Sequence, residues 1–202
     1  IHILGNGPSI ELFDRDAWPE SDVFVGCNFS DVNLRPDYTV IVDVRAMKEF
    51  RRGMDGYKLE IPAVVTQRAY DFIDKDSKGW HTMAPDIIHI KEVVPLIRDK
   101  SVSKTLAMNS GQHGAIYALE RNPDTKTVHL WGCDSLWSND LTSRTDPIVN
   151  RGNQSRHKPK VAAQWNRYWL SVFAKYPNVS FIVHKTSGHI NIKAENLTEV
   201  NG

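Results

Sequence analysis

Short apolar runs rich in β-branched residues recur along this chain, and they constrain its fold more than any other feature. Each run has about the length of a strand. Several are almost continuous in apolar residues, which is typical of strands buried on both faces of a sheet. We predict seven strands: Ile1–Leu4, Val23–Cys27, Tyr38–Asp43, Pro62–Thr66, Asp86–Ile90, Thr127–Trp131 and Val179–Val183.

Helical patterns fall between these runs, at Ser9–Arg15, Ala46–Arg52, Ser110–Arg121 and Lys160–Tyr176. The last is the strongest, because its apolar residues recur at spacings of three and four. Strands that alternate with helices predict an α/β fold. We therefore expect one Rossmann-like domain over residues 1–202, with a mainly parallel sheet and helices on both faces.

Two segments fit neither pattern. Gln67–Thr82 mixes aromatic and charged residues, and Ser135–Lys160 is long and polar. A connection of this kind is usually functional or mobile. Because residues 135–160 lie between the sixth strand and the long helix, we predict that they form a lid over a site.

Composition excludes several classes of protein. The 25 basic and 24 acidic residues give a formal net charge of +1, which argues against binding nucleic acid through bulk charge. No apolar run is long enough for an integral membrane segment. The only cysteines, Cys27 and Cys133, fit a reducing compartment, so we expect a cytoplasmic protein. The chain begins with Ile1 rather than Met, which suggests a trimmed sequence or the start of the ordered part.

Ligands of open α/β sheets bind at the carboxyl ends of the strands. The first strand is followed by Gly5-Asn6-Gly7-Pro8-Ser9. Its glycines allow a tight turn, Pro8 suits a first helical turn, and free N–H groups there would bind a phosphate. The pattern is neither a dinucleotide fingerprint nor a P-loop, and a plain strand–helix turn is the alternative.

Polar residues follow four other predicted elements or open them. Asn28 follows the second strand, where it is either a turn former or helix cap, or a residue whose amide binds a nucleotide or sugar. Asp43 follows the third and would hold a ribose hydroxyl, a metal ion, or Arg45 in an ion pair. Ser110 and Gly111 open a helix, with Ser110 as the expected N-cap. The remaining candidates, Gly132 and Asp134, follow the sixth strand.

One histidine stands out as a candidate general base. His157 ends the polar segment, and Arg156, Lys158 and Lys160 flank it. These cations would keep the imidazole neutral and would attract an anionic substrate. An exposed loop histidine is the alternative. His2, His89 and His129 lie within apolar strands, and we expect them to be packed. The sequence contains no His-x-x-x-His pair and no Cys-x-x-Cys pair, so metal binding is only weakly indicated.

These motifs, in this order, resemble the bacterial sialyltransferases of glycosyltransferase family 42. They are also similar to the DUF115 group, which includes archaeal 6-hydroxymethylpterin diphosphokinases of the MptE-like kind and flagellin-modification proteins. Within 35–43, Pro36-Asp37, an apolar strand and Asp43 resemble the DUF115 pattern. The resemblance covers most of residues 1–185.

The sialyltransferase resemblance implies a nucleotide-binding α/β domain with a lid, which uses a CMP-activated sugar and no essential metal. His157 would be the base that deprotonates the acceptor hydroxyl. The other implied contacts are to the nucleotide, its phosphate or the donor sugar: Asn6, Gly7, Ser9, Asn28, Ser110, Gly111, Gly132 and Asp134. The partners expected are therefore a nucleotide sugar and a small-molecule or glycan acceptor.

The chain also departs from that family. The sialyltransferases place one tyrosine two residues after the acid and a second in the lid, where both assist the leaving phosphate. Here the first position is Leu136, and Ser135–Lys160 contains no tyrosine. Trp137, or an arginine such as Arg144, Arg151 or Arg156, is a candidate substitute, since an arginine would neutralise developing phosphate charge.

Three hypotheses follow. The first is a nucleotide-sugar-dependent glycosyltransferase. The second is an MptE-like diphosphotransferase with ATP and Mg²⁺, with Asp43 and Asp134 on the metal side. The third is a non-catalytic nucleotide-binding relative, which the missing tyrosines suggest. An exposed aromatic face on the helix Lys160–Tyr176 would also allow a homo-oligomer.

Overall fold

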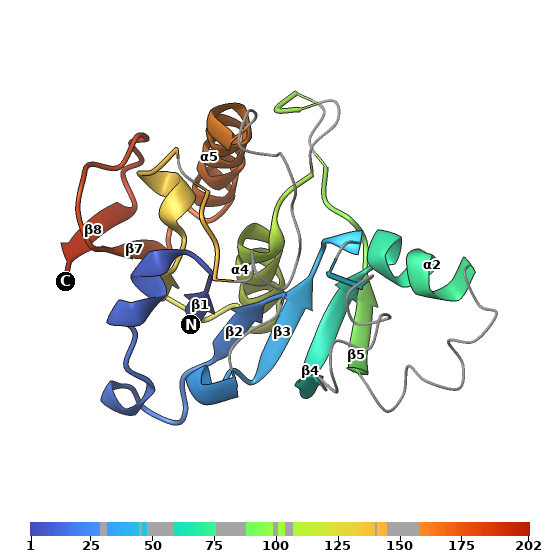
Figure 1. Ribbon diagram of the computed structural model, residues 1–202. Coiled ribbons are helices and arrows are strands. Elements are labelled where there is room, and N and C mark those ends of the chain that lie inside the picture. Colours follow the sequence, from blue (N-terminus) through green and yellow to red (C-terminus); the bar gives the residue numbers. More distant parts are fainter. Residues whose placement is uncertain are drawn as a thin grey trace.

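The computed structural model contains one sheet of eight parallel strands (Figure 1). Their spatial order is β5-β4-β3-β2-β1-β6-β7-β8. The strands are β1 (His2–Leu4), β2 (Phe24–Cys27), β3 (Tyr38–Ile41), β4 (Leu59–Thr66), β5 (Ile88–Val94), β6 (Thr127–Trp131), β7 (Ser180–Lys185) and β8 (Leu197–Asn201). The expected α/β architecture with a parallel sheet is confirmed.

The structure describes residues 1–28, 32–44, 46–47, 59–75, 88–98, 101–103, 107–139, 141–144 and 158–202, of which 32, 59, 60, 73–75 and 158 are described by their backbone alone. The predicted base His157 and its neighbour Arg156 lie outside these ranges. The same is true of Arg45 and of most of the predicted helix Ala46–Arg52.

Helical elements cover both faces of the sheet, as its alternating side chains require. Helices α4 (Ser110–Arg121) and α5 (Lys158–Lys175) pack on the face that presents Ile3, Val25 and Leu130. The opposite face is covered by the short 3-10 helix η1 (Pro8–Leu12), against Leu4 and Phe24, and by α2 (Gln67–Lys75). Figure 1 shows α2 beside β4 and β5 at one end of the sheet and β8 at the other.

Most predicted elements appear, and the differences have physical reasons. All seven predicted strands are present, whereas β8 was not expected, because only Leu197 of its residues is even half-buried. The segment Gln67–Thr82, which fitted neither the strand nor the helix pattern, contains α2. The predicted helix Ser9–Arg15 is instead η1 followed by a second 3-10 turn, η2 (Arg15–Ala17). None of the described helices is long and apolar enough to cross a membrane.

The aromatic stripe of α5 faces the core. Tyr168, Trp169 and Phe173 are buried against the sheet, and Trp165 and Tyr176 are half-buried. The expectation of an exposed aromatic helix face is therefore wrong, and with it the reason given for a homo-oligomer. The hydrophobic period was identified correctly, but it describes the inner side of the helix.

The histidines differ from one another in burial. His2 is fully buried, and its ring stacks on Phe24 and on the half-buried His129 at centroid distances of 4.6 and 4.7 Å. Burial lowers the pKa of His2 to about 4, although Asp22 accepts a hydrogen bond from it, so the ring is neutral at pH 7. The packed role expected for His2 and His129 is confirmed. His89 is exposed, because it lies on the edge strand β5, and that expectation is wrong.

The backbones that follow β1 and β6 approach each other with no room for a side chain. Gly5 N–H donates to Trp131 O at 2.7 Å, and Gly7 N–H donates to Gly132 O at 2.9 Å. A Cβ on Gly132 would lie 2.6 Å from Gly5 O, and Gly132 has a φ of +60°. Glycine is therefore required at this contact on two grounds, left-handed backbone and close approach.

Replacing Gly132 with alanine should lower the free energy of unfolding by about 3 kcal/mol, because the strain of positive φ adds to a clash with backbone. The control is Gly188→Ala, where φ is +81° but the nearest atom to an added Cβ is 3.8 Å away. It should cost about 1 kcal/mol, from φ alone. Urea unfolding of both variants measures the difference, and equal losses would contradict the close-approach argument.

Candidate functional site

The strand order places a crevice beside β1. From β1 the chain builds outward through β2, β3 and β4 to β5, and it then returns to add β6 on the other side of β1. Connections therefore leave β1 and β6 in opposite directions, and a crevice opens at the carboxyl ends of these strands. Open α/β sheets bind ligands at such a switch point.

A pocket of about 110 Å³ lies at this position. Its walls come from the loops after β1, β2 and β6, from the start of α4 and from α5. The lining residues are Gly5, Asn6, Gly7, Cys27, Asn28, Asn109, Ser110, Gly111, Gly132, Cys133, Asp134, Ser135, Leu141, Thr142, Ser143, Trp165 and Trp169.

The pocket brings together most of the residues that the sequence singled out. Asn6, Gly7, Asn28, Ser110, Gly111, Gly132 and Asp134 all line it. Three candidates do not. Pro8 is exposed at the start of η1, Ser9 is buried behind the pocket wall, and Asp43 lies after β3 outside the lining.

The loop after β1 does not offer the row of free N–H groups that was expected. The N–H groups of Gly5 and Gly7 donate to carbonyls of the β6 loop, as described above, and Ser9 N–H donates to Asp134 Oδ2 at 3.1 Å. Pro8 has no N–H. The expected free N–H groups are thus absent at these positions, because the loop uses them to hold the chain after β6.

The start of α4 offers backbone donors instead. Asn109, rather than Ser110, is the N-cap, and it forms a capping box with Gln112: Gln112 N–H donates to Asn109 Oδ1 at 3.1 Å, and Asn109 N–H donates to Gln112 Oε1 at 2.8 Å. Ser110 and Gly111 then occupy the first two helical positions, whose N–H groups have no partner within a helix. Both residues line the pocket, so the positive end of the helix opens into it.

Asn28 is held in an uncommon conformation beside this helix. Its φ is +53°, in the left-handed region. Three hydrogen bonds hold it there: its N–H donates to Val40 O, Thr39 Oγ1 donates to its carbonyl, and Ser110 Oγ donates to its Oδ1, each at 2.9 Å. Strained residues held in this way cluster at ligand sites, which agrees with the place of Asn28 in the pocket.

The acidic group of the pocket is Asp134, which opens the 3-10 helix η6 (Asp134–Leu136). Burial raises the pKa of its carboxyl, and hydrogen bonds from the N–H and hydroxyl of Ser9 act in the opposite direction. The thiols of Cys27 and Cys133 are also buried here; burial raises the pKa of Cys27 to about 12 and that of Cys133 as well. Both thiols are therefore protonated at neutral pH.

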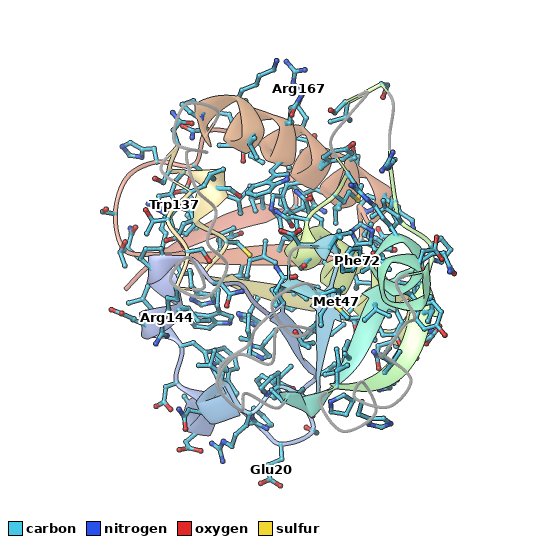
Figure 2. The ribbon with its side chains drawn as sticks, turned by 45° about the vertical axis from the view of Figure 1, so that its right-hand side comes forward. Glu20, Met47, Phe72, Trp137, Arg144 and Arg167 are labelled. Atoms are coloured by element: carbon cyan, nitrogen blue, oxygen red, sulfur yellow. The ribbon has the colours of Figure 1, made fainter. Side chains whose placement is uncertain are left out.

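Described cations lie outside the pocket lining. Arg144 is exposed next to Ser143, and its N–H donates to Asn6 O at 2.8 Å, which fixes the segment 141–144 over the loop after β1. Figure 2 shows Arg144 beside η1 and Arg167 on the outer side of α5. Among the residues that the structure describes, no group of three or more His, Cys, Asp or Glu side chains is arranged to hold a metal ion.

Sequence reasoning missed the aromatic wall and assigned it elsewhere. Trp165 and Trp169 line the pocket, and Trp169 is also a buried core residue. Trp137, which was a candidate substitute for the missing tyrosines, is half-buried and outside the lining. Nothing in the sequence around Trp165 distinguishes it from the core residues of the same helix, because one turn of α5 contributes side chains to both the core and the pocket.

Comparisons of this chain with family models, with curated proteins and with solved structures find no match.

A buried glutamine joins the two helices that flank the pocket. Besides its part in the capping box, Gln112 donates from Nε2 to Trp165 O at 2.7 Å. It is fully buried. Gln112 therefore fixes both the start of α4 and the position of the tryptophan wall.

Gln112→Ala should lower the free energy of unfolding by about 2 kcal/mol, because it leaves Asn109 N–H without its partner and removes the side-chain bond that joins α4 to Trp165 O. Gln164→Ala, the same change at a half-buried position on α5, should cost less than about 0.5 kcal/mol. Urea unfolding followed by tryptophan fluorescence measures both. Similar values for the two variants would show that the bonds of Gln112 add no stability.

Proposed function

We propose that this protein is a Rossmann-like glycosyltransferase, which transfers a sugar from a CMP-activated donor to an acceptor hydroxyl. The observation that carries the proposal is the composition of the pocket. Seven residues that the family 42 resemblance assigns to the donor site come from four separate segments of the chain and line one pocket at the switch point.

The pocket supplies groups that suit a nucleotide. The N-terminus of α4 provides N–H groups and a positive dipole for an anionic group of the donor. The amides of Asn6 and Asn28 offer neutral hydrogen bonds, and the indole of Trp165 offers a stacking surface. No described lysine, arginine or histidine lines the pocket, so the helix terminus is the described source of positive charge there.

The reaction we propose needs one base and one leaving group. His157 accepts the proton of the acceptor hydroxyl, whose oxygen attacks the anomeric carbon of the donor sugar. The new bond joins that oxygen to the anomeric carbon, and the bond from this carbon to the phosphate oxygen breaks. The nucleotide leaves with the electron pair, and Arg156 is positioned in the sequence to stabilise its charge.

A diphosphotransferase with ATP and Mg²⁺ is the second candidate. It would use Asp43 and Asp134 on the metal side, but Asp43 does not line the pocket that holds Asp134. We therefore rank it below a reaction that needs no metal. A third possibility, a relative that binds a nucleotide without turnover, shares the pocket and differs only in product formation.

The cellular setting is also part of the proposal. Cys27 and Cys133 are free thiols in the described structure, which suits a reducing compartment such as the cytoplasm. The acceptor would then be a small molecule or glycan present there.

A thermal-shift screen with CMP, CDP, UDP, GDP and ATP, each with and without Mg²⁺, tests the donor class. CMP or CDP should raise Tm without Mg²⁺, since ligand binding to the native state stabilises it. Gly111→Leu should abolish the shift by filling the pocket. Gly111→Ala is the matched control, because its Cβ would lie 3.4 Å or more from the nearest atoms and should preserve the shift.

Other results of the screen would overturn the proposal in distinct ways. A shift that requires Mg²⁺ and prefers ATP supports the diphosphotransferase. No shift with any nucleotide contradicts a nucleotide site altogether. A shift that Gly111→Leu leaves unchanged places the nucleotide elsewhere on the protein.

His157→Ala should reduce transfer from the donor identified by the screen at least about 100-fold, while the nucleotide-induced change in Tm persists, because a general base contributes to turnover and not to donor binding. His189→Ala, at an exposed position after β7, is the control and should retain full turnover. Full turnover in His157→Ala would show that another group takes the proton.

A further inference from the structure

Ser9 lies behind the pocket wall, where it forms hydrogen bonds with Asp134 and with Gly132 of the loop after β6. It is fully buried. Its N–H donates to Asp134 Oδ2 at 3.1 Å, and its hydroxyl donates to Asp134 Oδ1. Gly132 N–H donates in turn to Ser9 Oγ at 3.2 Å. Because Oγ accepts from Gly132, the hydroxyl hydrogen is directed at the carboxylate.

Both carboxylate oxygens of Asp134 are therefore held by one residue. Each carboxylate oxygen can accept about two hydrogen bonds. Ser9 donates one hydrogen bond to each carboxylate oxygen, so each oxygen can still accept one more. Gly7 permits this arrangement, since a Cβ at that position would lie 2.6 Å from the carboxyl carbon of Asp134.

We propose that Ser9 is a positioning residue, not a phosphate ligand, and that it holds Asp134 so that the carboxylate accepts hydrogen bonds from two neighbouring hydroxyls of the ligand. This rests on the proposed function for the identity of the ligand, in which the ribose of the nucleotide supplies the hydroxyl pair. An ionised carboxylate only accepts hydrogen bonds, so it selects a donor group and repels a phosphate.

Apart from burial, which acts in the opposite direction, Ser9 is the main described influence on the ionisation of Asp134. From the strand side, Cys27 and Cys133 are the titratable groups, and both are neutral thiols at pH 7. From α5 and the start of α4 the pocket receives Trp165, Trp169, Ser110 and Gly111, none of them charged. Arg144, beside the pocket, is exposed to solvent.

The sign of the pH effect follows from these contacts. Burial favours the neutral carboxyl, and the two donors of Ser9 favour the carboxylate. Removing the hydroxyl of Ser9 should raise the pKa of Asp134 further. Binding that needs the carboxylate should then fail at a higher pH in Ser9→Ala than in the wild type.

The first test needs no ligand. The ¹³C chemical shift of the Asp134 carboxyl, followed through a pH titration by NMR, reports its ionisation in the wild type, Ser9→Ala and Ser9→Thr. We expect the midpoint to move upward in Ser9→Ala and to return toward the wild-type value in Ser9→Thr, which restores a hydroxyl. An unchanged midpoint in Ser9→Ala overturns the positioning role, because a purely structural residue would not move it.

The second test compares CMP with 2′,3′-dideoxy-CMP by calorimetry. In the wild type the dideoxy compound should bind about tenfold more weakly. In Ser9→Ala both compounds should bind with nearly the same, weaker affinity. Asp134→Asn should also lose the preference for CMP over the dideoxy compound. This variant replaces the Ser9 variants in the test if they do not fold. A preference that persists in Asp134→Asn, or is absent from the wild type, overturns the hydroxyl contact.

The two tests separate this inference from the proposed function. If CMP and the dideoxy compound both fail to bind the wild type, the nucleotide proposal and the ligand half of this inference fail together. The titration of Asp134 in the free protein still decides whether Ser9 controls the carboxyl.

Discussion

The contact between the backbones after β1 and β6 is the constraint on which the site depends. Gly5 and Gly132 meet without side chains, and the N–H groups of the first loop hold the carbonyls of the second. This contact brings Asp134 over Ser9 and places it at the opening of α4. A larger residue at either glycine would separate the two loops. The pocket between them would then change shape even though every other residue that lines it stayed the same.

The sequence predicts the sheet well because seven of its strands are wholly or partly buried and have the apolar composition that such burial requires. Runs such as Thr127–Trp131 are apolar where the strand is covered on both faces, and this strand has the predicted bounds. β8 carries no such signal, since a mostly exposed edge strand has few apolar residues. The first predicted helix is also wrong: the run Ser9–Arg15, which follows Pro8, satisfies the helical pattern, yet only 3-10 turns form.

For the site, position after a strand was the informative signal, and side-chain partners were not predictable. Asn28, Gly132 and Asp134 reach the pocket because parallel strands end at one edge. Ser9 has the same kind of sequence position, but its donors serve Asp134, more than a hundred residues away. That pairing depends on β1 lying next to β6, and nothing in the local sequence specifies which strands are neighbours.

The position of β1 at the centre of the sheet also governs how the chain can fold. His2 pairs with Phe24 on one side, which is close in sequence, and with His129 on the other, which is not. During synthesis, the edge of β1 that pairs with β6 remains unpaired until residues 127–131 have been made. An apolar strand with an open edge is prone to pair with other chains. Folding becomes slower as contacts become less local, and the β1–β6 pairing beside the pocket joins the most distant segments of any strand pair in the sheet.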